Sequence, residues 1–426
     1  MFKKHIQKKL EGYVRQYFKK HPEVKLVAVA GSLGKTSTKI AIATVLSGQY
    51  RVRLHDSSRS TPLGVPLEVL GIEYPQTGGL FAWMRVLRAA RQRIHAPADV
   101  EVIVQELGTD GPGAMAHYGT YLLPDMVVIT AITSEHMDVF STIESVAQEE
   151  LTAAQFSRLA IINRDDIDGR HASYLTNGNL TTYGTSGAAE YRFVTEDFNP
   201  EAGHTGLLIV PDSAQPLSVA IRAVGEHSLR PAIAAAAVGF KLGMNAATVI
   251  KGLSQLEPLP GRMNLIRGVR QTILIDDTYS SGPQSSASAL QTLYTFQVPQ
   301  RIAVFTSMNN LGSDSQKEHE ALGRLCDPSL LSWVVIIGDE AARYVAPAAK
   351  TQGCQVMVCA NALEAGAFVH KVLDDGAAIL FNGSEADMYC EEALKVVLHS
   401  TDDESLLIRQ SPEWLATKAR FFSKFA

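Results

Sequence analysis

Apolar runs alternate with stretches of helical periodicity over residues 25–180. The apolar runs are Lys25–Ala30, Val100–Glu106, Met126–Thr130 and Leu159–Asn163. This alternation predicts an α/β fold with a mostly parallel sheet and helices on both of its faces. In such sheets functional residues lie at the carboxyl ends of the strands, so we expect candidate chemistry there.

The pattern changes after residue 180. Residues 181–225 contain two short strand candidates, GLLIV and LSVAI, separated by Gly, Pro and Asn, and this predicts a small antiparallel insert. Arg230–Leu242 is rich in Ala and has Pro231 in its first turn, which is typical of a helix. The turn-rich segment Leu256–Arg262 then predicts a domain boundary.

Strand candidates return beyond this boundary, with helical patterns between them, and they predict a second α/β domain. They are Thr272–Asp276, Arg301–Thr306, Trp333–Ile337, Gln355–Val358 and Ala378–Phe381. We therefore expect an N-terminal helix in residues 1–24, a central domain in residues 25–260 and a C-terminal domain in residues 261–426. The length of 426 residues agrees with two or three domains, at roughly 150 residues each.

Residues 2–20 have the pattern of a basic amphipathic helix. Seven Lys and Arg side chains surround an apolar stripe formed by Phe2, Ile6, Leu10, Val14 and Phe18. Two interpretations are open: a helix docked on the domain that follows, or a helix in contact with an anionic membrane surface. The narrowness of the stripe favours docking.

Composition narrows the class of protein. A net charge of −5 gives no reason to expect a nucleic-acid partner. The four cysteines form no CxxC pair and have no metal-ligand spacing, which indicates reduced thiols in a cytoplasmic protein. No apolar run reaches the ~18 residues of a membrane span, and the N-terminus lacks the apolar segment of a signal peptide.

The segment LVAVAGSLGKTST, residues 26–38, contains the strongest candidate for a binding site. An apolar run ends at Gly31, and Lys35 and Thr36 open a helical pattern after Gly34. Glycines allow backbone N–H groups to face an anion, and the helix N-terminus adds its positive dipole end. Lys35 can reach phosphate oxygens, and the Thr36 hydroxyl can ligate Mg²⁺. A nucleotide site is favoured over a plain strand–turn–helix connection.

Four acidic or imidazole side chains follow the neighbouring strands. Glu106 ends an apolar run beside the loop strand and can hold the same cation, or it is a helix cap or surface residue. His136 follows the next run and can bind a second cation, although a lone His is more often structural. Glu149 and Glu150 lie on a predicted helix, where a solvated face is the simpler interpretation.

Taken together and in this order, several motifs resemble the Mur ligase family of ATP-dependent amide-bond ligases. They are GSLGKTST, QELGTDGPG, ITAITSEHMDVF, INRDD, LPGRMN and IDDTYSSGP, and VVIIGDEAARY and the NGS at residues 382–384 extend the likeness. The resemblance is strongest to the branch that adds D-alanyl-D-alanine to the UDP-muramoyl tripeptide. It implies a central ATP-binding domain and a C-terminal Rossmann-like domain that closes over it.

The resemblance also implies roles for individual residues, with ATP and Mg²⁺ as cofactors. The phosphates are expected on the loop residues Gly31, Ser32, Gly34, Lys35, Thr36 and Ser37. Thr36 and Glu106 are expected to hold a first Mg²⁺, and Glu106 and His136 a second. Arg262 is expected to stabilise phosphate charge when the domains close, and Asp277 to bind the ribose hydroxyls.

Some positions depart from the family pattern. The family usually begins with a domain that binds a UDP-sugar, whereas 24 residues precede the loop strand here, so we expect a different acyl substrate or a different mode of binding. The carbamylated lysine of the family falls on Glu150, which can supply a fixed anion. In the parts of the site where the family binds adenine and the amine substrate, Pro231 and Ser280 replace asparagines and Asn382 replaces a lysine.

We therefore expect a ligase that activates a carboxylate as an acyl phosphate and joins it to an amino acid or dipeptide, in peptidoglycan-precursor synthesis. Two alternatives are open. One is a ligase with a different acyl acceptor, as in the polyglutamylating or polyamide-forming relatives of the family. The other is a nucleotide-binding or scaffold protein that has lost ligation. The expected partners are small molecules rather than nucleic acid.

Overall fold

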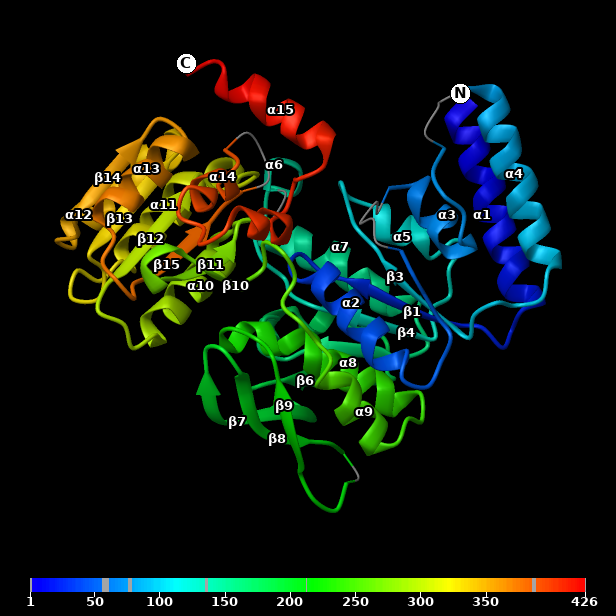
Figure 1. Ribbon diagram of the computed structural model, residues 1–426. Helices are drawn as coiled ribbons and strands as arrows, with labels where there is room; N and C mark the ends of the chain where they lie inside the picture. The colour runs from blue at the N-terminus through cyan, green and yellow to red at the C-terminus, as the bar shows by residue number, and fades with distance from the viewer. Residues whose placement is uncertain are drawn as a thin grey trace.

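The protein is described by a computed structural model that covers residues 2–55, 61–75, 79–134, 137–211, 213–384 and 388–425. Within these ranges the strands form two sheets, one of nine strands and one of six (Figure 1). The predicted boundary at residues 256–262 falls between helix α9, Ala246–Leu253, and strand β10, which begins the second sheet.

The central sheet has the strand order β2-β3-β1-β4-β5-β6-β7-β8-β9. All pairs from β2 to β7 are parallel, and β7, β8 and β9 are antiparallel. The predicted antiparallel insert is therefore present, but it extends the parallel sheet because β7 pairs directly with β6. The strands are β1 Lys25–Ala30, β2 Val52–Leu54, β3 Val102–Glu106, β4 Met126–Ile129, β5 Ala160–Asn163, β6 Leu180–Gly184, β7 Tyr191–Asn199, β8 Gly203–Ile209 and β9 Leu217–Ile221.

Helices cover both faces of this sheet, as the alternating pattern predicted. Val27 and Val29 of β1 pack with one group of helices: α2 Lys35–Leu46, α8 Arg230–Lys241 and α9. Leu26, Ala28 and Ala30 pack with the other group: α1 Phe2–Lys20, α3 Gly64–Leu70, α4 Leu80–His95, α5 Ala114–Tyr118, α6 Met137–Phe140 and α7 Ile143–Gln155. Because successive side chains of a strand point to opposite faces, a buried parallel strand needs apolar residues at every position.

Helix α1 is docked on the central sheet's layer of helices, against α3 and α4. Ile6, Leu10 and Val14 of the predicted stripe are buried. Phe2 and Phe18 are not, and Tyr17 takes the last buried place, so the prediction was wrong at the two ends of the stripe. A repeat of four residues drifts around a helix of 3.6 residues per turn, and this drift moves both ends away from the contact.

The second sheet has the order β10-β11-β15-β12-β13-β14, in which only the β10–β11 pair is antiparallel. Its strands are β10 Asn264–Arg267, β11 Ile273–Asp277, β12 Arg301–Thr306, β13 Trp333–Ile337, β14 Val356–Cys359 and β15 Ala378–Asn382. Its helices are α10 Pro283–Thr295, α11 Ser315–Arg324 and α12 Ala346–Thr351 on one face, α13 Ala362–Val372 and α14 Glu391–Lys395 on the other, and the terminal α15 Pro412–Phe422. All four cysteines are buried and free of disulfides. In the described part of the chain, no helix combines the length and apolarity that crossing a membrane requires.

The docking of α1 makes a testable prediction about stability. Leu10 is fully buried in the contact with the central layer, so Leu10→Ala should lower the free energy of unfolding by about 3 kcal/mol. Phe2 of the same helix is 46% exposed, and Phe2→Ala should change it by less than about 0.5 kcal/mol. Urea unfolding followed by circular dichroism measures both. Equal effects of the two substitutions would contradict the docked position of α1.

Candidate functional site

The glycine-rich loop joins β1 to α2 with two residues in the left-handed region. Gly31 has a φ of +124° and Gly34 a φ of +81°. A Cβ on Gly31 would lie 2.3 Å from the Thr130 hydroxyl oxygen and 2.9 Å from the backbone nitrogen of Ala131. Gly31 is thus required for its conformation and for its closeness to the strand beside it. Lys35 is the first residue of α2, so the positive end of that helix faces the loop.

The side chain of Lys35 folds back over this loop. Its Nζ donates hydrogen bonds to the carbonyl oxygens of Gly31 at 2.6 Å and Ser32 at 3.0 Å. The amino group therefore lies directly beside the backbone that the sequence marked as a phosphate cradle. A phosphate on the loop would exchange these neutral acceptors for anionic ones, which form stronger hydrogen bonds with an ammonium group.

Glu106 ends β3 next to the loop. The pairing of β1 with β3 places Val29 opposite Glu106, and the Thr36 hydroxyl donates to Glu106 Oε2 at 3.1 Å. Glu106 is only 5% exposed. A hydroxyl and a carboxylate that converge in this way are hard oxygen ligands of the kind that Mg²⁺ prefers.

Lys39 is a residue of this cluster that the sequence reasoning missed. Its side chain is buried, its Nζ lies 3.7 Å from Glu106 Oε2, and it donates to the carbonyl oxygen of His55 at 2.9 Å. The available signal was a lysine at the start of the mostly apolar helix sequence KIAIATVL. A buried carboxylate beside a buried ammonium group can stay charged, because each offsets the desolvation of the other.

Glu149 and Glu150 of α7 are both buried, so a solvated helix face was the wrong interpretation. Glu150 Oε2 accepts a hydrogen bond from the Gly31 N–H at 2.8 Å. The carboxylate of Glu149 accepts from the N–H groups of Gly113 at 2.8 Å and Met115 at 2.7 Å, at the start of α5. Each carboxylate thus fixes the backbone of a glycine-containing turn.

His136, the candidate ligand of a second cation, lies outside the described residues. Among the residues that are described, no group of three or more His, Cys, Asp or Glu side chains is placed to hold a metal ion. The cation site that the geometry supports is therefore the pair formed by Thr36 and Glu106.

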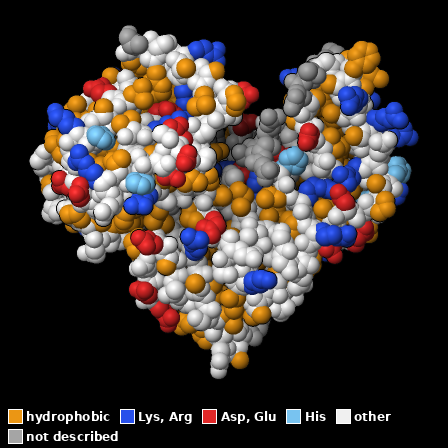
Figure 2. Space-filling model, in the orientation of Figure 1, with side chains coloured by type: hydrophobic (Ala, Val, Ile, Leu, Met, Phe, Trp, Pro, Cys, Tyr) orange, Lys and Arg blue, Asp and Glu red, His pale blue; other side chains and the backbone are white. Residues whose placement is uncertain are grey.

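A cleft separates the loop from the C-terminal sheet, and Figure 2 shows the hollow between the two lobes of the molecule. The cleft is lined by the loop and Glu106 on one side and by residues 279–285 and 309–311 on the other. A second cavity continues from Ser37 to Arg230, Pro231 and Asp277. The loop residues 32–37, Asp277 and Pro231, which replaces an asparagine of the family pattern, thus lie along two adjoining cavities.

Arg262 lines both cavities. Its guanidinium carbon lies 4.0 Å from the centre of the Tyr279 ring, which is a cation–π contact. The Gly261 N–H beside it donates to Asp276 Oδ2 at 2.8 Å, with Gly261 at a φ of +71°. Arg262 is therefore held at the junction of the two sheets and faces the cleft.

Asp277 is buried at the end of β11, where Asn382 Nδ2 donates to its Oδ2 at 2.7 Å. Asn382 Oδ1 in turn accepts from the Ser286 hydroxyl at 2.7 Å. Burial raises the pKa of Asp277 to about 7 and that of its neighbour Asp276 to about 6. Asn382 stands where the resemblance places a lysine, so this group of side chains has one positive charge fewer than the family pattern.

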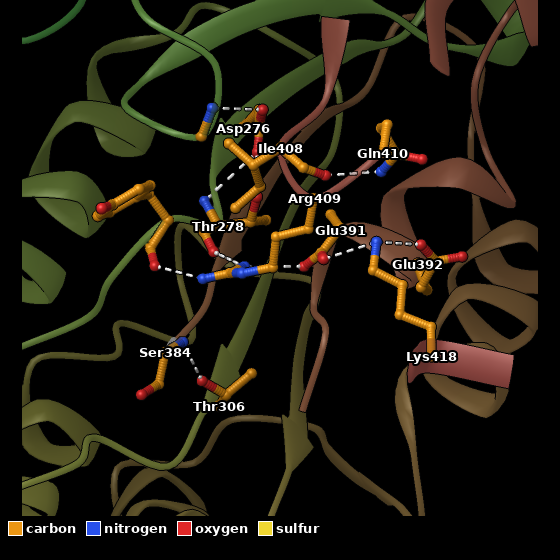
Figure 3. Close-up of polar contacts among 12 residues, drawn as sticks. Asp276, Thr278, Thr306, Ser384, Glu391, Glu392, Ile408, Arg409, Gln410 and Lys418 are labelled. Atoms are coloured by element: carbon orange, nitrogen blue, oxygen red, sulfur yellow. Dashed lines mark hydrogen bonds and ion pairs between the residues drawn. The ribbon is translucent and has the colours of Figure 1, made fainter. Parts of the chain in front are cut away.

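Arg409, near the C-terminus, holds the loop that follows β11 and begins at Thr278 (Figure 3). Arg409 donates to the carbonyl oxygens of Thr278 at 3.2 Å and Tyr279 at 2.8 Å, and to Glu391 Oε2 at 3.2 Å. Glu391 is fully buried, and its other oxygen lies 2.8 Å from Nζ of Lys418 in α15. Nothing in the sequence motifs pointed to this network, because its members lie more than 100 residues from the loop that they support.

The chain is similar to known proteins over most of its length. Residues 29–239 match the Mur ligase middle domain, and residues 261–385 match the Mur ligase glutamate ligase domain. A UDP-N-acetylmuramoyl-tripeptide–D-alanyl-D-alanine ligase of Bacillus subtilis is 26% identical over 323 residues, which are 74% of this chain and 63% of the relative. This chain therefore spans less than two thirds of that relative.

Solved structures share the fold. MurF from Acinetobacter baumannii superposes with a TM-score of 0.74 at 22% identity, covering 90% of this chain and 79% of that one. The MurF ligase from Thermotoga maritima in complex with ADP gives a TM-score of 0.73 at 21% identity, covering 92% of this chain and 83% of that one. The α/β architecture that the alternating pattern predicted is confirmed by these superpositions.

The contacts of Arg409 predict a loss of stability on its removal. Arg409→Met leaves the buried Glu391 carboxylate with one cationic partner fewer and removes the donor to two carbonyl groups. The free energy of unfolding should fall by on the order of 3 kcal/mol. Arg420→Met, at an exposed position of α15, is the matched control and should have little effect. If the two variants unfold at the same urea concentration, the network does not support this loop.

The raised pKa of Asp277 predicts a dependence of stability on pH. The pKa of Asp277 is about 7 in the folded protein, against an ordinary value of 3.8. The contribution of this carboxyl group to the free energy of unfolding is therefore fully present below about pH 4, and it is lost as the pH rises through 7. Asp277→Asn keeps the shape and an acceptor for Asn382 but does not titrate. The stability of the variant relative to the unaltered protein should therefore increase between pH 4 and 7, by on the order of 3 kcal/mol. Urea unfolding at several pH values measures this difference, and a difference that does not change with pH would contradict the assignment.

Proposed function

Since the chain belongs to the Mur ligase family, we propose that it is an ATP-dependent ligase, which activates a substrate carboxylate as an acyl phosphate and joins it to an amino acid or dipeptide. We place the reaction in peptidoglycan-precursor synthesis because a D-alanyl-D-alanine ligase is among its relatives. A cytoplasmic location is part of the proposal, and the four free cysteines support it.

The observation that carries the proposal is the contact between Thr36 and Glu106 beside the glycine-rich loop. Backbone N–H groups, a lysine, a hydroxyl and a buried carboxylate converge there, and this donor set suits a nucleotide phosphate with Mg²⁺. Thr36 and Glu106 would hold the ion, which would neutralise phosphate charge during transfer. We retain His136 as a proposed ligand of a second Mg²⁺, on the sequence pattern alone.

The remaining proposed roles belong to residues of the loop and of the two cavities. Gly31, Ser32, Gly34, Lys35 and Ser37 would bind the phosphates, and Lys35 would leave its loop carbonyls to do so. Asp277 would accept hydrogen bonds from the ribose. Arg262 would reach the transferred phosphate from the C-terminal side when the cleft closes.

For Glu150 we propose a role in holding the loop. Its hydrogen bond to the Gly31 N–H fixes the first turn of the phosphate cradle, and its buried charge is a fixed anion at the position of the carbamylated lysine of the family. This role requires no direct contact with a metal ion.

A second candidate function is ligation to a different acyl acceptor. The observation in its favour is Asn382, whose neutral amide bridges Asp277 and Ser286 where the family pattern has a lysine. Loss of a charged partner in the C-terminal sheet changes the electrostatics of the cleft without touching the loop. A screen of amino acids, dipeptides and glutamylated acceptors by phosphate release separates the two candidates.

The proposed roles predict the effect of two substitutions on nucleotide binding. Calorimetric titration of the unaltered protein with Mg·ATP should show binding, and Lys35→Ala should weaken it by about a hundredfold or more. Glu106→Ala should weaken Mg·ATP binding but change the binding of ATP without Mg²⁺ much less, because the carboxylate acts through the ion. Lys350→Ala, at an exposed position of α12, is the control.

Two outcomes would contradict the proposal. If the unaltered protein binds neither Mg·ATP nor Mg·GTP, the loop is not a nucleotide site. If Lys35→Ala or Glu106→Ala retains full phosphate release with an accepted substrate pair, the assigned residues do not take part in the reaction.

A further inference from the structure

Helices α1 and α4 lie side by side at one edge of the molecule (Figure 1), and their outward surface, here called the α1–α4 face, is strongly basic. The two helices contain eleven Lys and Arg residues and one Glu, a formal charge of +10 in a chain whose net charge is −5. Lys20 Nζ lies 2.9 Å from His95 Nδ1, so the C-terminal ends of both helices are at the same end of the pair.

The apolar sides of both helices are buried in the core. Ile6, Leu10 and Val14 of α1 and Trp83 and Val86 of α4 are buried against the central layer. All seven basic residues of α1 and three of the four of α4 are exposed. None of these ten has a carboxylate within 4.0 Å in the parts of the chain that the structure describes. Their charge is therefore available to an anionic partner.

Apolar side chains are exposed at the opposite end of the pair, where both helices begin. Phe2 is 46% exposed, Leu80 57%, Phe81 81% and Met84 56%. Figure 2 shows hydrophobic side chains at the tip of this lobe, with Lys and Arg side chains beside them. An exposed cluster of large apolar side chains next to basic ones marks an interaction surface.

We propose that the α1–α4 face binds an anionic lipid surface, with the apolar tip among the lipid headgroups and the basic side chains on the lipid phosphates. Lys and Arg beside exposed Phe, Leu and Met are the combination that interfacial binding requires. The charge argues against a second copy of the chain, because two faces of +10 would repel each other. Leu80 and Met84 of the tip argue against a nucleic acid, because aliphatic side chains add nothing on a phosphate backbone and cannot stack on bases as Phe81 could.

The proposal differs from insertion of α1 alone, because the apolar stripe of α1 is buried. Most of the apolar contact comes from the start of α4, and α1 contributes charge and Phe2. It is also independent of the proposed ligase activity, since the face contains none of the residues assigned to the loop or the cleft.

Co-sedimentation with lipid vesicles tests the proposal on the full chain. The protein should sediment with vesicles of equimolar phosphatidylcholine and phosphatidylglycerol, and not with vesicles of phosphatidylcholine alone. Binding should weaken steeply as salt is added, because the attraction is electrostatic at the surface. Equal binding to both vesicles, or binding to neither, would overturn the proposal.

Variants separate the contribution of the basic side chains to vesicle binding from that of the apolar tip. Arg85→Gln with Arg88→Gln should weaken binding by about 25-fold, at about fivefold for each basic residue near an anionic surface. Phe81→Ser with Met84→Ser should weaken it by about tenfold and leave the salt dependence in place. Lys350→Gln with Lys371→Gln, and Leu363→Ser, change exposed residues of α12 and α13 and should have no effect. Lys4→Gln with Lys8→Gln replaces the arginine pair if that variant does not fold.

Two further measurements test whether the α1–α4 face instead binds a second copy of the chain or a nucleic acid. Sedimentation velocity of the unaltered protein and of Phe81→Ser with Met84→Ser should give the same monomer mass; a larger mass that the substitutions abolish would assign the face to a second copy and overturn the proposal. Fluorescence anisotropy with a single-stranded oligonucleotide should show weaker binding than to the anionic vesicles. Tight oligonucleotide binding together with no vesicle binding would likewise overturn it.

Discussion

The candidate site depends on one buried carboxylate, that of Glu106. It ends β3 beside the glycine-rich loop, where it meets the Thr36 hydroxyl and the ammonium group of Lys39. A carboxylate removed from water is tolerated only with charge or hydrogen-bond partners, so the positions of α2 and β3 are coupled through it. The parallel pairing of β1 with β3 makes this contact possible, because it brings the ends of the two strands to the same edge of the sheet.

Other buried carboxylates hold the turns around the site. Glu150 accepts from the N–H of Gly31, Glu149 from that of Gly113, and Asp276 from that of Gly261. In each case a glycine supplies a backbone conformation that other residues rarely adopt, and the carboxylate fixes it. The loop is thereby held in shape by a side chain 119 residues away, and the junction between the sheets by one 15 residues away.

The C-terminal segment extends this principle across the cleft. Arg409 holds the backbone of Thr278 and Tyr279, and the Tyr279 ring lies against Arg262. Arg409 is itself fixed by Glu391, which Lys418 of α15 also contacts. The position of Arg262 at the cleft therefore depends on residues near the end of the chain, beyond the segment that matches the glutamate ligase domain.

The sequence by itself determined the α/β class and the loop at Gly31–Thr36. Among the strands that the structure describes, it also determined all but β2, β6, β7 and β10, to within two residues at most ends. These are properties of local pattern: continuous apolar runs form buried parallel strands, and glycines before a lysine form a tight turn into a helix. The local pattern also showed that α1 is a helix, although the repeat of four residues placed Phe18 rather than Tyr17 in the contact.

Only the tertiary structure decided which charged residues are buried and what they contact. The positions of Glu149 and Glu150 in the sequence are typical of a solvated helix, and Lys39 and Arg409 stand in no motif. Whether an acidic side chain faces water or a backbone N–H depends on the packing of elements that lie tens to hundreds of residues apart, and the free energy of burial is settled only when a partner is in place. For the same reason the sequence could count the positive charges of α1 and α4, but only their packing side by side determined that these charges form one surface.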